Sequence, residues 1–144
     1  MEEHWTLADQ NFVEAFKDCT LNPGWFTHEA HLRIGYLYIN IFGVRLAAKK
    51  LCQGIAKFDN AHGDGTKFHR TITMASIAIL QHFREKSNSC NFADLLNEYP
   101  VLKNNFKGLL LTHYSENLIY NEESRIFYKL PDRLPDRVFE KVNF

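Results

Sequence analysis

Cysteine is scarce in this sequence, and its three copies lie far apart. Cys19, Cys52 and Cys90 form no C-x-x-C pair, and an odd number leaves no complete disulfide framework. A thiolate zinc site is not expected either, because such sites group several cysteines closely. We therefore expect reduced, mostly buried thiols, which are typical of a cytoplasmic protein.

Charge of one sign and long hydrophobic runs are also missing. The 144 residues carry 17 basic and 17 acidic side chains, for a formal net charge of zero. Because a domain that coats nucleic acid or an anionic membrane needs a basic surface, we expect neither partner. The longest apolar stretch, residues 34–44, is too short and too interrupted to span a bilayer, and the acidic start of the chain does not resemble a secretory signal.

Two familiar catalytic motifs are absent as well. No G-x-S-x-G nucleophile elbow occurs, so a Ser-His-Asp hydrolase is poorly supported. The glycine-rich stretch at residues 59–65 lacks the Gly-Lys-Ser/Thr of a phosphate-binding loop. His62 in this stretch, together with His4 and His82, is expected at the surface.

Large apolar side chains are plentiful, with 12 phenylalanines and 6 tyrosines. They recur at intervals of three and four residues, which is the helical pattern, and no strand-like alternation of useful length occurs. We predict an all-α, single-domain helical bundle over residues 1–144, with about five to seven helices and an irregular C-terminal tail. The predicted helices cover residues 6–19, 27–42, 44–58, 67–86, 91–99, 101–112 and 121–128.

Polar residues mark the starts of several predicted helices. Thr27, Asn91, Ser115 and Asn121 carry side-chain oxygens that can accept a hydrogen bond from the first helical turn. Thr66 is predicted to cap the fourth helix in the same way. In the second helix, Gly35 would leave room for a ligand or for a closely packed helix.

Two histidines three residues apart open the second predicted helix. Because residues i and i+3 share a helix face, His28 and His31 can turn toward one point. Short connections make successive helices antiparallel, so the start of the fourth helix, with His69, lies at the same end of the bundle. The stretch that ends in His113 should return to this end. The sequence therefore predicts a pocket lined by His28, His31 and His69, with His113 as a fourth member.

Such a pocket suits a divalent metal. Helix N-termini disfavour protonated imidazole, and neutral imidazole is the form that binds metals. Three histidines with an open fourth position would make a catalytic-type site, for Zn²⁺ first of all, which activates water for hydrolysis or transfer on a small molecule. Glu29 is the candidate base and Tyr114 a candidate phenol donor, while Arg33 or Arg125 can bind an anionic group.

Other interpretations use the same residues. The histidines can act as acid and base without a metal, or form a satisfied polar network in a protein that only binds a ligand or partner. Thr73 and Ser76 either line a pocket below the histidines or bond back to their own helix. Each arginine can pair with a nearby acid such as Asp132 or Glu29. An aromatic-rich helix face can also form the interface of a homodimer.

Several of these segments together resemble a family of small bacterial helical proteins. The resemblance spans about residues 26–135 and implies no particular activity. DinB-like helical bundles are a looser likeness, since they gather three histidines from different helices around a divalent metal. Their histidine spacing differs from the spacing here, so this likeness supports only the plausibility of a metal site. The segments that carry the family resemblance are F-T-H-E-A-H-L-R at residues 26–33, F-H-R-T-I-T at 68–73, L-T-H-Y-S at 111–115, Arg125, and P-D-R-L-P at 131–135.

Overall fold

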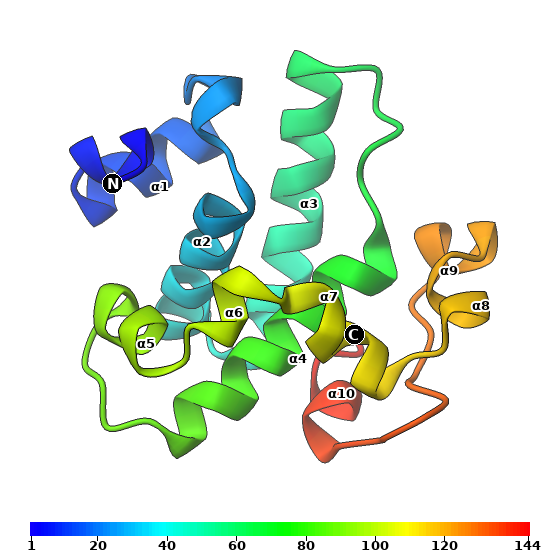
Figure 1. Ribbon diagram of the computed structural model, residues 1–144. Coiled ribbons are helices and arrows are strands. Elements are labelled where there is room, and N and C mark those ends of the chain that lie inside the picture. Colours follow the sequence, from blue (N-terminus) through cyan, green and yellow to red (C-terminus); the bar gives the residue numbers. More distant parts are fainter.

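The computed structural model describes residues 1–144 and is entirely helical (Figure 1). This confirms the predicted all-α fold, although the ten α-helices exceed the predicted five to seven. No helix is long and apolar enough to cross a membrane. The elements are η1 (Glu3–Thr6), α1 (Asp9–Lys17), η2 (Pro23–Trp25), α2 (His28–Phe42), α3 (Val44–His62), α4 (Arg70–Lys86), α5 (Phe92–Glu98), α6 (Val101–Asn104), α7 (Phe106–His113), α8 (Glu116–Ile119), α9 (Glu122–Ile126) and α10 (Arg137–Lys141).

The three long helices α2, α3 and α4 pack against one another and form the centre of the molecule. Figure 1 shows α1 on one side of this centre and α8 and α9 on the opposite side. At Gly35 an added Cβ would lie 2.9 Å from Leu80 Cδ1 and 3.3 Å from Ile77 Cδ1. Of the two roles predicted for Gly35, the structure therefore shows the closely packed helix.

A second close approach joins α1 to α3. An added Cβ at Gly54 would lie 2.7 Å from Cε2 of Phe16, whose ring is almost fully buried. The Phe16 ring also packs against the rings of Phe26, Tyr38 and Phe58. This aromatic group has little freedom to move, so α1 docks where α3 carries no side chain.

The connection between α3 and α4 differs from the prediction. Helix α3 continues through Asp59 to His62, and α4 begins at Arg70 with His69, not Thr66, as its N-cap. The cause is the Asp59 carboxylate, whose Oδ2 accepts hydrogen bonds from the backbone N–H groups of Lys67 and Phe68. These bonds hold the segment before α4 out of the helix.

Four predicted caps are confirmed. Thr27, Asn91, Ser115 and Asn121 each accept a hydrogen bond from a backbone N–H in the first turn of the following helix. The first α-helix, α1, begins at Asp9, three residues later than predicted, because Thr6 is the last residue of η1. The predicted helix over residues 101–112 is interrupted at Asn105, which separates α6 from α7.

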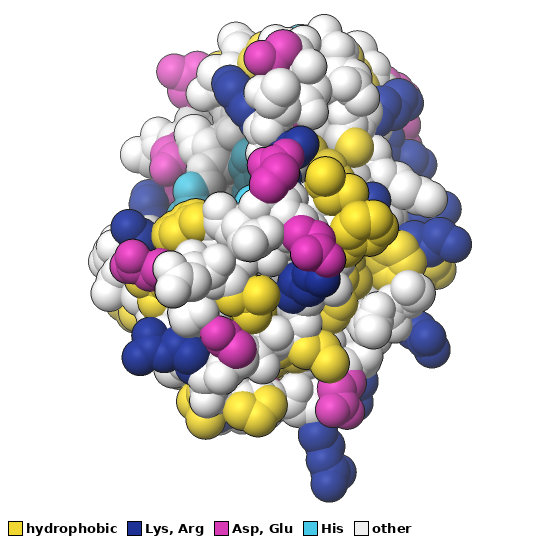
Figure 2. Space-filling model, turned by 90° about the vertical axis from the view of Figure 1, so that its right-hand side faces the viewer, with side chains coloured by type: hydrophobic (Ala, Val, Ile, Leu, Met, Phe, Trp, Pro, Cys, Tyr) yellow, Lys and Arg dark blue, Asp and Glu magenta, His cyan; other side chains and the backbone are white.

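The C-terminal segment wraps back over the core. Lys129 N–H donates to Thr71 Oγ1 on α4 at 3.1 Å, and α10, which was not predicted, packs on α4. Val138, Phe139 and Val142 bury their side chains there. Figure 2 shows the face on the right-hand side of Figure 1, where exposed apolar and charged side chains lie side by side.

Candidate functional site

The structure does not gather the four predicted histidines at one point. No three of them bring ring nitrogens within 4.8 Å of one another. His69 is fully engaged, because Nδ1 accepts from the N–H of Ile72 and Nε2–H donates to the carbonyl of Ile119. His113 lies away from the others and donates from Nδ1 to the carbonyl of Leu134 at 2.7 Å. The break at Asn105 explains this, because the prediction for His113 assumed one unbroken helix over residues 101–112.

His28 and His31 do share a cavity, of about 350 Å³, between α2, α3, α4 and α7. Both interpretations of Thr73 and Ser76 hold: they line this cavity, and their hydroxyls donate to the carbonyls of His69 and Ile72. The bonded hydroxyls leave a mostly apolar wall. We call this the inner cavity; its other lining residues are Leu32, Leu51, Ile55, Ile72, Leu80 and Phe106.

The protonation of His31 follows from its contacts. Nδ1 lies 2.7 Å from the carbonyl oxygen of Thr27, which can only accept, so Nδ1 carries the proton. Burial lowers the pKa of His31, so its ring is neutral at pH 7 and Nε2 carries a lone pair. The only fully enclosed polar side-chain atom without a partner is Arg33 Nε. His31 Nε2 also has no partner but is not among the enclosed atoms, so it is accessible, and His31 lines two cavities.

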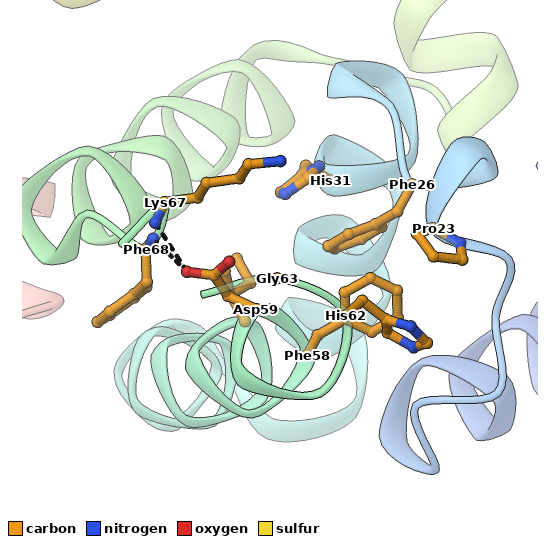
Figure 3. Close-up of a pocket in the computed structure, with 10 residues that line it drawn as sticks. Pro23, Phe26, His31, Phe58, Asp59, His62, Gly63, Lys67 and Phe68 are labelled. Carbon is orange, nitrogen blue, oxygen red and sulfur yellow. Dashed lines mark hydrogen bonds between the residues drawn. The ribbon is translucent and has the colours of Figure 1, made fainter. Parts of the chain in front are cut away.

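A second cavity of about 170 Å³ also borders His31 (Figure 3). Asp59, which is buried, binds two backbone N–H groups through Oδ2, while Oδ1 has no partner and points into the cavity. The Lys67 side chain extends across it toward His31 (Figure 3). We call this the outer cavity; its other lining residues are Pro23, Phe26, Ile55, Phe58, His62, Gly63 and Phe68.

His31 and Ile55 are thus common to both cavities. The sequence pointed to His31 but not to Asp59 or Lys67. The available signal was weak: an acid, a histidine and a lysine flank one glycine-rich connection. Asp59 and Lys67 come together with His31 because α3 continues to His62, whereas the predicted helix ended at residue 58. His62 is exposed as expected, and its Nε2–H donates to the carbonyl of Cys19.

Arg33, which was predicted to bind an anionic group in the site, is buried and binds the N-terminal segment of the chain instead. It donates to the carbonyls of His4 and Leu7 at 2.8 and 2.9 Å and to Asp9 Oδ1 at 2.8 Å. Its guanidinium also lies over the rings of Trp5 and Phe12, at 4.5 and 4.3 Å from their centroids. Arg33 lines neither of the two cavities that border His31, and its acidic partner is Asp9 rather than the predicted Glu29 or Asp132.

Glu29, the predicted base, belongs to the same buried cluster. It accepts hydrogen bonds from Trp5 and from His4 Nε2–H, and it pairs with Lys103. Burial opposes its ionisation, but the hydrogen bonds from Lys103 and Trp5 prevail and hold the pKa of Glu29 below its usual value. His4 is fully buried, which corrects the prediction of an exposed side chain.

Glu2, His4 and Glu29 form the one group of three metal-ligand side chains whose ligand atoms lie within 4.8 Å of one another. A cationic side chain of the protein already pairs with this group, since the ammonium of Lys103 contacts both Glu29 and Glu2. Trp5 points an N–H at the same carboxylate. Lys103 therefore compensates one of the two carboxylate charges, and the oxygens of Glu29 are engaged by Lys103, Trp5 and His4.

Tyr114 and Arg125 complete the predicted site, and both have structural partners. Tyr114 is fully buried, its O–H donates to the carbonyl of Lys129 at 2.7 Å, and burial raises its pKa. Arg125 pairs with Glu122 at 2.7 Å on the surface of α9. Neither side chain borders the outer or the inner cavity.

Acidification is expected to destabilise the fold through His4 and His31. Burial lowers the pKa of both rings below the usual histidine value of about 6.5, so the unfolded chain binds protons that the folded chain rejects. Stability should therefore fall as the pH drops below about 6.5, by at most about 1.4 kcal/mol per pH unit for each ring. Urea unfolding at pH 7, 6 and 5 measures this. The His31→Gln variant should show a shallower pH dependence, and an unchanged slope would contradict the assignment.

Comparisons with protein-family models, with curated proteins and with solved structures found no match to this chain.

Proposed function

We propose that this chain binds a small molecule in the outer cavity, with His31 as the central polar contact. The observation that carries the proposal is a neutral imidazole, fixed through Nδ1 and open at Nε2, between two cavities. Binding sites are typically concave and mostly apolar, with few polar groups that fix the orientation of the ligand. Asp59, Lys67 and His31 are such groups.

The same geometry gives His31 the form of an acid–base catalyst. A neutral imidazole with an accessible Nε2 can accept a proton from a bound molecule at pH 7, and the Thr27 carbonyl stabilises the resulting cation. The proposal includes no metal. His31, Asp59 and His62 line one cavity, but their ligand atoms do not form a group within 4.8 Å.

The test is NMR titration with n-butylamine, butyrate, 1-butanol and benzyl alcohol, read at the His31 imidazole. We expect at least one probe to bind with a Kd below about 1 mM. Ile55→Phe, which places a larger side chain in the wall of both cavities, should weaken that binding at least tenfold. Ile41→Phe is the matched control, because Ile41 is exposed and lies outside both cavities.

Two results would overturn this proposal. One is the absence of any probe-induced shift at His31. The other is equal binding by Ile55→Phe and Ile41→Phe, which would place the bound probe elsewhere on the protein.

A further inference from the structure

We infer that the ligand is a zwitterionic amino acid with an apolar side chain, bound with its charged groups in the outer cavity and its side chain in the inner cavity. This inference rests on the proposed function and names the class of ligand. It follows from three features: a free carboxylate oxygen, a lysine without an ion pair, and an apolar space behind His31.

The ammonium group is matched by Asp59 and His31. Asp59 Oδ1 and His31 Nε2 both lack partners, and both are acceptors, so a ligand group that contacts the two of them is a donor. An ammonium supplies three donors together with the countercharge for a buried carboxylate. The rings of Phe26, Phe58 and Phe68 also line this cavity, and aromatic faces favour a cation.

The carboxylate group is matched by Lys67. Asp59 and Lys67 line the same cavity, yet their side chains form no ion pair, and Lys67 takes part in none of the chain's salt bridges. A simple amine would meet the like charge of Lys67, and a simple carboxylate would meet that of Asp59. A zwitterion is the ligand that satisfies both.

The side chain is matched by the inner cavity. This space adjoins the outer cavity at His31 and Ile55, and most of its lining is aliphatic or aromatic. An apolar cavity of about 150 Å³ holds benzene, so about 350 Å³ accommodates a side chain of the size of leucine. An amino acid without a side chain would leave this space unused.

Calorimetric and NMR titration with four matched probes tests the inference. L-leucine carries an ammonium, a carboxylate and an apolar side chain. Of the other probes, 3-methylbutylamine lacks the carboxylate, 4-methylpentanoate lacks the ammonium, and glycine lacks the side chain. We expect L-leucine to bind at least tenfold more tightly than each of the others. Glycine should bind more weakly because it has no side chain to bury, and each buried methylene strengthens binding about fourfold.

Two variants assign the contacts. Lys67→Gln should weaken leucine about tenfold and remove its advantage over 3-methylbutylamine, whereas Lys86→Gln, an exposed lysine at the end of α4, should change neither. Ser76→Leu, which fills the inner cavity, should weaken leucine but leave glycine unchanged. Gln53→Leu on the exposed face of α3 is its control.

The outcomes separate this inference from the proposed function. If 3-methylbutylamine or 4-methylpentanoate binds as tightly as leucine, the zwitterion is overturned and the binding cavity stands. The same holds if leucine fails to bind while benzyl alcohol shifts the His31 signal. If no probe of either set shifts that signal, both proposals fall.

Discussion

Replacing Arg33 with methionine is expected to lower the free energy of unfolding by about 2–4 kcal/mol. Methionine fills most of the space but leaves the partly buried carbonyl of Leu7 without a donor, at about 1–3 kcal/mol, and leaves the His4 carbonyl with the N–H of Leu7 as its one donor. The lost stacking on Trp5 and Phe12 adds to this. Relief of the unpartnered Nε offsets part of the cost, and the pair with the exposed Asp9 contributes little.

Urea unfolding at pH 7 measures the loss in Arg33→Met. Arg125→Met is the matched control, since its surface pair with Glu122 should contribute less than about 1 kcal/mol. Leucine affinity per folded molecule should stay unchanged in Arg33→Met. If this variant were as stable as Arg125→Met but lost ligand binding, Arg33 would belong to the functional site after all.

Replacing Gly54 with valine is expected to lower the free energy of unfolding by about 2–3 kcal/mol, because the added side chain occupies the place where α1 packs on α3. The new Cβ would lie 2.7 Å from the Phe16 ring, and three other aromatic rings prevent that ring from moving aside. The higher helix propensity of valine over glycine returns only a few tenths of a kcal/mol. Thermal and urea unfolding both report this loss.

Two further variants, Gly54→Ala and Ala93→Val, are the comparisons for Gly54→Val. Gly54→Ala should cost less than Gly54→Val, since alanine brings one carbon and gains about 1 kcal/mol of helix propensity. Ala93→Val places valine at an exposed position of α5, where it should cost less than about 1 kcal/mol. Equal stabilities of Gly54→Val and Ala93→Val would show that α1 can shift freely over α3.

Features that depend on neighbouring residues could be predicted from the sequence. The caps at Thr27, Asn91, Ser115 and Asn121 are bonds across two or three residues, so the residue types alone identify them. The helical periodicity likewise fixed the fold class. These are local agreements between a side chain and the backbone beside it.

Features that depend on distant partners could not be predicted. Arg33 reaches residues 24 to 29 positions away, in a segment whose path no local pattern specifies. His69 became an N-cap because Asp59, ten residues earlier, holds the backbone before it. The outer cavity depends on this same contact, so His31 could be selected from the sequence but its neighbours could not.

The docking of α10 on α4 has a consequence for the order of folding during synthesis. Val138, Phe139 and Val142 cover α4 more than fifty residues after that helix is made. A chain growing from its N-terminus therefore displays a bare apolar face on α4 until this last segment emerges. Apolar surface that is exposed in this way during synthesis makes a nascent chain prone to aggregation until the covering segment docks.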